Sequence, residues 1–174
     1  MSIQVVQVIP VIDYSVRGLC TKPYPGHKKG CPNFNHKNGC PPGVKKFDEE
    51  YDLSKPVYAI VNSFDLAAHV EKMRIDHPKW SHRQLVCCLY WQRRARKQLF
   101  EGIKLFMREH RHYAVEPCPE AMGVEITKTL QAAGIYLEWP PKTVAYQVAL
   151  AAIKTAKSQA RPDSLKYKYG EVVK

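Results

Sequence analysis

The sequence predicts a single α/β or α+β domain with a small sheet of about four strands, about four helices and a cysteine-rich loop at one edge. Three observations lead to this prediction. A chain of 174 residues with 45% apolar content is long enough to form one hydrophobic core. Segments rich in β-branched residues alternate with segments of helical periodicity. Proline and glycine recur through residues 17–46. We therefore assign the domain to residues 1–157, the loop to 17–46 and a polar tail to 158–174.

The first half of the chain predicts a strand, the loop, a second strand and a helix. Residues 3–12 are mostly β-branched and form the first strand, with Pro10 near its end. Residues 57–61 are continuously apolar and predict a buried strand. A helix over 64–76 follows, capped by Asn62 or Ser63.

A long amphipathic helix is predicted to begin at Ser81, because Ser81 and Gln84 have the spacing of a capping box. Apolar and small residues then recur at three- and four-residue steps. Cys87 and Cys88 lie within this run, and buried cysteine is a common small core residue, so both are predicted to be structural. The predicted stripe contains Leu85, Cys88, Leu89, Gln92, Ala95, Leu99, Ile103, Phe106 and Met107.

The last part of the chain predicts two further strands and two helices. Residues 112–116 form a third strand, and Pro119 opens a helix that extends to Ala133. Residues 135–139 form a fourth strand. Thr143 begins an alanine-rich helix, because alanine has the highest helix propensity. This helix carries Val144, Val148, Leu150 and Ile153.

Three cysteines, Cys20, Cys31 and Cys40, lie in a loop whose prolines and glycines exclude a helix or a central strand. Because this segment has little apolar material to bury, we expect it to be either disordered or fastened by its thiols. Soft metals and iron–sulfur clusters prefer thiolate ligands. The gaps between these cysteines are wider than those of zinc ribbons, so their spacing alone does not identify the metal.

Cys118 is predicted to be the fourth ligand. Cys31, Cys40 and Cys118 are each followed by proline, as is the last cysteine of a common cluster-binding run. Cys118 also precedes a predicted helix start, where free backbone amides favour a thiolate. His27 and His36 lie between the loop cysteines and are alternative ligands of a zinc site. Disulfides, or a proline-rich loop with no ligand, remain open alternatives.

The formal net charge of +11 is unevenly distributed. Residues 17–46 contain seven Lys or Arg residues and no Asp or Glu, which gives +7. A second basic run occupies a predicted helix, with Tyr90 and Trp91 nearby. Such surfaces attract polyanions, so RNA or single-stranded DNA is a candidate partner. The second run contains Arg93, Arg94, Arg96 and Lys97.

Several other functions are not favoured by the sequence. It contains no nucleophile elbow, no His-Glu-x-x-His motif, no phosphate-binding loop and no dinucleotide fingerprint. No apolar run is long enough to span a membrane, and the first segment lacks a basic leader and a cleavage site. We therefore expect a cytoplasmic protein without a membrane partner. The residues do not identify a catalytic group.

The residues Cys31-Pro-Asn-Phe34 and Cys40-Pro-Pro42 resemble a family of small predicted metal-binding proteins of unknown function. That family has a cysteine loop of the form Cys-Pro-Asn-(Tyr/Phe)…Cys-Pro-Pro, and near its C-terminus a cysteine before a helix, like Cys118 here. The likeness spans roughly residues 20–153 and implies metal binding without naming a reaction. This chain lacks the second cysteine-rich cluster that is usual in the family, and keeps only Cys118 there.

Two functional hypotheses follow. The first is a metal-binding protein with a [4Fe-4S] cluster on Cys20, Cys31, Cys40 and Cys118, in redox, sulfur-transfer or RNA-modification chemistry. The second is a basic module stapled by zinc that binds nucleic acid or a protein partner without catalysis.

Overall fold

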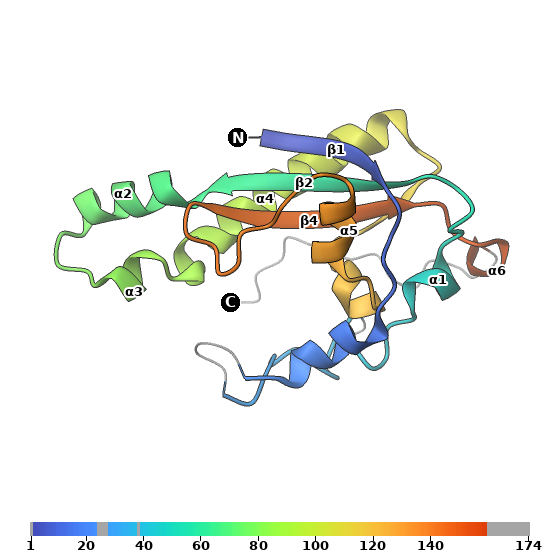
Figure 1. Cartoon of the computed structure of the whole chain (residues 1–174), viewed down its shortest axis with the longest axis horizontal. Coiled ribbons are helices and arrows are strands. Elements are labelled where there is room, and N and C mark those ends of the chain that lie inside the picture. The colour runs from blue at the N-terminus through green and yellow to red at the C-terminus, as the bar shows by residue number, and fades with distance from the viewer. Residues whose placement is uncertain (1, 24–27, 38, 160–174) are drawn as a thin grey trace.

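A computed structural model describes residues 2–23, 28–37 and 39–159. Four antiparallel strands form one sheet in the order β1-β2-β4-β3, and helices cover both faces (Figure 1). The predicted class, a mixed α/β single domain with a four-stranded sheet, is confirmed. The strands are β1 (Ser2–Val8), β2 (Val57–Asp65), β3 (Ala114–Glu116) and β4 (Val144–Ala152). The helices are η1 (Tyr14–Thr21, 3₁₀), α1 (Phe47–Glu50), α2 (Leu66–Asp76), α3 (His82–Leu85), α4 (Cys88–Glu109), η2 (Pro119–Met122, 3₁₀), α5 (Ile126–Ala132) and α6 (Ala156–Gln159).

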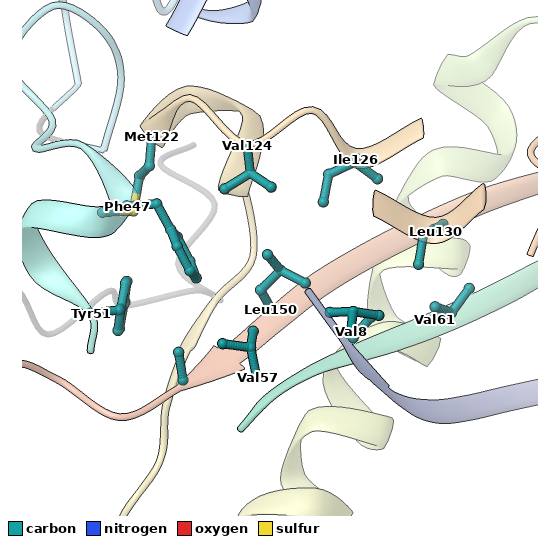
Figure 2. Close-up of a cluster of buried hydrophobic side chains, with 12 residues drawn as sticks. Val8, Phe47, Tyr51, Val57, Val61, Met122, Val124, Ile126, Leu130 and Leu150 are labelled. Atoms are coloured by element: carbon teal, nitrogen blue, oxygen red, sulfur yellow. The ribbon is translucent and has the colours of Figure 1, made fainter. Parts of the chain in front are cut away.

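The two central strands are buried on both faces, and their side chains alternate between two cores. Val57, Ala59 and Val61 of β2 face one side of the sheet, where η2 and α5 lie (Figure 2). Ile60 and Phe64 face the opposite side, where α4 packs. Every residue of β2 from Val57 to Phe64 is therefore covered at least in part, which explains the continuous apolar run in the sequence.

Helix α4 approaches the sheet closely because small residues line the contact. Ala149 and Ala151 of β4 are fully buried beneath it, and Ala95 has no exposed surface. At Gly102 of α4, an added Cβ would lie 2.9 Å from Cγ2 of Ile3 in β1. A larger residue at any of these positions would push the helix away from the strands.

The structure contradicts the prediction for residues 135–153. Residues 144–152 form β4, a central strand, and not the predicted alanine-rich helix. Residues 135–139 form no strand; Tyr136 and Trp139 are exposed, and the Glu138 carboxylate accepts hydrogen bonds from the backbone N–H groups of Thr143 and Val144. Tertiary packing therefore overrides the helix propensity of alanine, because only small side chains fit between β4 and α4.

The helix starts are mostly as predicted, but the long helix is divided. Ser81 and Gln84 do form a capping box, yet the helix that they open, α3, ends at Leu85. α4 begins at Cys88, and the indole N–H of Trp91 donates to the Val86 carbonyl, which lies in the break between the two helices. Asp65, and not Asn62 or Ser63, caps α2.

The remaining predicted boundaries differ in detail. β1 ends at Val8, before Pro10, and β3 is confirmed as Ala114–Glu116. Pro119 does open a helix, but η2 ends at Met122 and α5 begins at Ile126. The helix predicted from Pro119 is divided because Gly123 adopts the left-handed conformation, with a φ of +93°, and ends η2.

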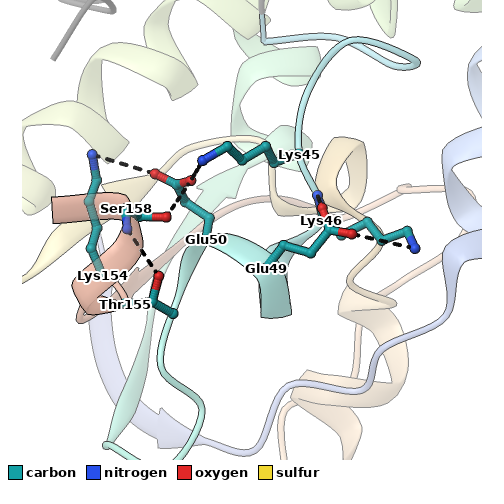
Figure 3. Close-up of polar contacts among 7 residues, drawn as sticks. All are labelled: Lys45, Lys46, Glu49, Glu50, Lys154, Thr155 and Ser158. Atoms are coloured by element: carbon teal, nitrogen blue, oxygen red, sulfur yellow. Dashed lines mark hydrogen bonds and ion pairs between the residues drawn. The ribbon is translucent and has the colours of Figure 1, made fainter. Parts of the chain in front are cut away.

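Glu50 attaches α6 to α1 (Figure 3). Its carboxylate accepts a hydrogen bond from the Ser158 hydroxyl at 2.9 Å and pairs with Lys45 at 2.6 Å and Lys154 at 3.7 Å. The predicted boundary between domain and tail thus falls within α6; residues 160–174 lie outside the described residues. In the described residues, no helix is both long and apolar enough to cross a membrane.

Candidate thiol site

The cysteine loop begins in a helix. Cys20 lies in the last turn of η1. The prediction that prolines and glycines exclude a helix from this loop is therefore wrong for the first residues of the loop. The N–H of Cys31 donates to the carbonyl of Cys20 at 2.7 Å. Gly30, which precedes Cys31, has a φ of +84°. A Cβ at this position would lie 2.6 Å from the Cys20 carbonyl oxygen. Close approach of Cys20 and Cys31 therefore depends on glycine at position 30.

The rest of the loop is held by protein groups. The Arg17 guanidinium donates to the carbonyls of Pro42 and Val44, at 3.1 and 2.7 Å, and closes the loop across its ends. The N–H of Asn35 donates to the carbonyl of Pro41 at 2.9 Å. These hydrogen bonds hold the loop without a ligand, which agrees with the alternative of a proline-rich loop that binds no metal.

Cys118 lies at the start of η2, which packs against η1. Two hydrogen bonds join these segments: the N–H of Asp13 donates to the Gly123 carbonyl, and the N–H of Glu125 donates to the Val11 carbonyl. The Tyr14 ring fills the space beside Gly123, where a Cβ would lie 2.6 Å from a ring carbon. The polypeptide thus brings the segment that carries Cys118 beside the segment that carries Cys20.

The four predicted cysteines share one electrostatic neighbourhood. Desolvation raises the pKa of the Cys20 thiol, and Cys31, Cys40 and Glu120 raise it further. Desolvation followed by the charge of Cys31 also raises the pKa of Cys40. All six cysteines are free thiols, so the disulfide alternative is not formed in this structure.

Two carboxylates adjoin Cys118. Although Cys118 is exposed, its pKa is raised to about 12, mainly because the protein atoms around the thiol desolvate it. Glu116, Glu120 and Cys40 contribute to this increase, and Arg96 opposes it. The Glu116 carboxylate accepts the Cys118 N–H at 2.8 Å, and desolvation raises the pKa of Glu116 to about 6. Glu116 and Glu120 were not predicted as site residues. They lie two residues before and two residues after Cys118, and this proximity in the sequence could have identified them.

A cavity of about 580 Å³ lies beside the first two thiols. His36, an alternative ligand, lines it together with Cys20 and Cys31, whereas Cys40 and Cys118 do not line it. His27 lies outside the described residues. The other lining residues are Thr21, Lys28, Lys29, Gly30, Pro32 and Phe34.

No group of three or more His, Cys, Asp or Glu side chains is arranged as a metal site within residues 2–23, 28–37 and 39–159. Ligation of one metal ion or cluster by all four thiolates would therefore require a rearrangement of these side chains.

Cys87 and Cys88 are separate from this neighbourhood. Cys87 is partly buried as the residue preceding α4, and Cys88 is exposed at its first position. The prediction that both are buried core residues is wrong for Cys88, because the helix begins here and its first residue faces solvent. Leu89, also assigned to the apolar stripe, is 80% exposed because it lies off the buried side of α4, which contains Trp91, Ala95 and Leu99.

The predicted basic residues fall on different sides of α4. Arg93, Arg94, Arg96 and Lys97 are all exposed. Desolvation lowers the pKa of His69 in α2, and the charge of Arg94 lowers it further. The charge of Arg96 instead lowers the pKa of Cys118. At 100° per residue, Arg94 and Arg96 are separated by about 200° in one direction and 160° in the other. Trp91, predicted to be near the basic surface, is buried and stacks on Phe64.

Comparisons of this chain with protein-family models, with curated proteins and with solved structures found no match. The resemblance to the metal-binding family therefore stays a prediction.

Proposed function

We propose that this chain is a metal-binding protein whose ligands are the thiolates of Cys20, Cys31, Cys40 and Cys118. The observation that supports the proposal is that the fold brings these residues together from two segments far apart in the sequence. The Cys31 N–H bonds to the Cys20 carbonyl, and η2, which begins after Cys118, packs against η1. Cys40 in turn raises the pKa of both Cys20 and Cys118. Four free thiols are a soft donor set that suits either an iron–sulfur cluster or zinc.

A [4Fe-4S] cluster is the favoured occupant. Such a cluster with thiolate ligands carries net negative charge, and Lys28 and Lys29 line the cavity beside Cys20 and Cys31. When bound, it would supply electron transfer, or sulfur-transfer and RNA-modification chemistry if one iron keeps an open position. Whether Cys118 is a ligand distinguishes these two classes. Because free thiols persist in a reducing compartment, we place the protein in the cytoplasm.

The residues of the site would bind the metal in competition with protons. The pKa values of Cys20, Cys40 and Cys118 are all raised, so these thiols are neutral at pH 7. Ligation must release their protons, and the apparent metal affinity should rise with pH. Glu116 and Glu120 oppose the Cys118 thiolate, which makes this ligand the most difficult to deprotonate.

Metal analysis of anaerobically purified protein tests the proposal. Iron with acid-labile sulfide and a brown colour would indicate a cluster, and about one zinc with no colour would indicate the zinc alternative, in which His36 completes the site. Cys31→Ser and Cys40→Ser should each lose the metal, whereas the matched control Cys88→Ser should retain it. Equal metal content in all three variants would refute the assignment.

We propose nucleic acid as a second, separate partner, bound by the outer side of α4. Arg93 and Lys97 lie opposite the buried side of this helix, and neither pairs with a carboxylate in the described parts of the chain. Unpaired cations on one helix side favour phosphate binding.

Retention of RNA at low salt tests this second proposal. Arg93→Gln with Lys97→Gln should weaken binding and reduce its salt dependence, whereas Lys55→Gln, which removes an exposed charge in a turn, should change binding less. Absence of RNA binding at low salt would remove nucleic acid as a partner.

A further inference from the structure

Three aromatic rings form a ladder where α2, α3 and α4 meet, at the end of the molecule where α2 and α3 extend beyond the sheet (Figure 1). The His77 and Trp80 rings stack with centroids 4.0 Å apart and planes 7° from parallel. The Trp80 and Tyr90 rings follow at 4.8 Å and 36°. His77 is exposed, Trp80 is partly exposed and Tyr90 is 51% exposed. The ladder therefore lies at the surface, although one part of Trp80 packs against the core cluster that contains Phe64 and Trp91.

Cations border this ladder on both sides. Lys79 and Arg83 are exposed in the segment that carries Trp80. Along α4, Arg93 and Lys97 follow Tyr90 by three and seven residues, so they lie on its side of the helix, about 5 and 10 Å further along the axis. No ion pair involves these four cations within the described ranges.

We propose that the His77–Trp80–Tyr90 ladder is a stacking platform for unpaired bases, so that the nucleic acid bound by this chain is single-stranded. This inference rests on the nucleic-acid proposal above and specifies its substrate class. Aromatic rings at a surface accept bases by stacking irrespective of sequence, while neighbouring cations contact the phosphates. A base placed on the exposed side of Tyr90 would extend a series of rings in which His77 and Trp80 are stacked and Tyr90 is tilted against Trp80.

The chemistry of the surface favours a single strand over a duplex or a membrane. In a duplex the bases are already stacked on one another and present only their edges in the grooves, so the rings would have no partner. A membrane-binding helix presents a broad apolar side. Here the His77 and Trp80 rings are stacked and the Tyr90 ring is tilted against Trp80. Leu89 beside Tyr90 is exposed, but the cations Arg93 and Lys97 follow Tyr90 on its side of α4.

Fluorescence anisotropy with three labelled probes separates the contribution of base stacking from that of phosphate contacts. The probes are oligothymidylate of about twelve nucleotides, an abasic strand of equal length that keeps the phosphates, and a duplex of the same length. We expect oligothymidylate to bind at least about five-fold more tightly than the abasic strand. Tyr90→Ala should abolish that difference, and Tyr90→Phe, which keeps the ring, should preserve it.

Matched variants control for charge and for folding. Tyr136→Ala removes an exposed tyrosine elsewhere and should leave all affinities unchanged. Arg93→Gln and Lys97→Gln should weaken binding of both single strands alike and lower the slope of affinity against salt by about 0.7 each. Thermal melting of each variant by circular dichroism establishes that it is folded.

Three results would overturn the inference. One is equal affinity for oligothymidylate and the abasic strand. Another is an unchanged preference in a folded Tyr90→Ala variant. The third is tighter binding to the duplex, or to vesicles of anionic lipid, than to the single strand. Absence of binding to any nucleic acid at low salt would instead refute the second proposed function, which makes the two failures distinguishable.

Discussion

The backbone N–H of Cys31 donates to the backbone carbonyl of Cys20 at 2.7 Å, and both residues line the same cavity. The contact is possible because residue 30 has no side chain. The position of the first two candidate ligands is thus a property of the polypeptide and does not depend on a metal.

Gly30→Ala should reduce metal content without removing a thiol. The added Cβ would lie 2.6 Å from the Cys20 carbonyl oxygen, and the φ of +84° is unfavourable for alanine. The turn must open, and we expect the bound metal per chain to fall by half or more, as roughly estimated from a strain of about 1–3 kcal/mol. Gly18→Ala is the control, since nothing lies within 4 Å of its Cβ. Equal metal content in the two variants would contradict this prediction.

Cys118 should react slowly with iodoacetamide although it is exposed. Its pKa of about 12 leaves little thiolate at pH 8, because neighbouring atoms desolvate the thiol and Glu116 and Glu120 repel its charge. We expect alkylation of metal-free protein, followed by mass spectrometry of peptides, to be roughly ten-fold or more slower at Cys118 than at the exposed Cys88. Glu120→Gln should accelerate the reaction at Cys118 and at Cys20, because Glu120 raises the pKa of both thiols, and should leave the rate at Cys88 unchanged. A rate at Cys118 equal to that at Cys88 would be inconsistent with the raised pKa.

Ala149→Val should destabilise the protein by about 1–3 kcal/mol, despite the higher strand propensity of valine. Ala149 has no exposed surface and lies beneath α4, so two added methyl groups must displace the helix. Gln147→Val, at a partly exposed position on the same side of β4, serves as the comparison. Urea unfolding monitored by circular dichroism measures both changes. A stabilised Ala149→Val variant would show that the contact can relax without cost.

Glu138→Gln should lower stability at neutral pH, and the loss should shrink as the pH falls. Backbone N–H groups of Thr143, Val144 and Lys142 lower the pKa of Glu138 from 4.5 to about 2. A depressed folded-state pKa means that the ionised form contributes stability above the unfolded pKa, and that this contribution declines as the pH falls towards 2. Thermal midpoints of both proteins at pH 7, 5 and 4 measure this effect. A difference between them that does not depend on pH would argue against it.

The sequence predicted the fold class and most strands because β-branched runs and capping patterns are local signals. Residues 57–61 are buried on both sides, and Pro119 does open a helix. Residues 144–152 were mistaken for a helix because alanine favours helices in isolation. The small side chains of this segment are instead needed for close packing against α4, which is a tertiary requirement that no local pattern displays.

The sequence predicts which residues compose the candidate site, but not how they are arranged. Cys20, Cys31, Cys40 and Cys118 lie in two segments that the fold brings side by side, and their role as metal ligands stays a prediction. The role of Arg17 as an internal clamp depends on carbonyls 25 and 27 residues away, which only the folded chain brings together. The ladder of His77, Trp80 and Tyr90 also joins two helices and a loop, so Trp91 was the wrong aromatic residue to expect beside the cations.

The hydrogen bond between Asp13 and Gly123 joins the first tenth of the chain to its last third. During synthesis, the three loop thiols emerge long before residue 118 leaves the ribosome, and the fourth can reach them only after η2 has docked. For the metal site proposed above, a nascent chain would therefore expose an incomplete set of ligands. Ligation by all four thiolates would have to follow the folding of η2.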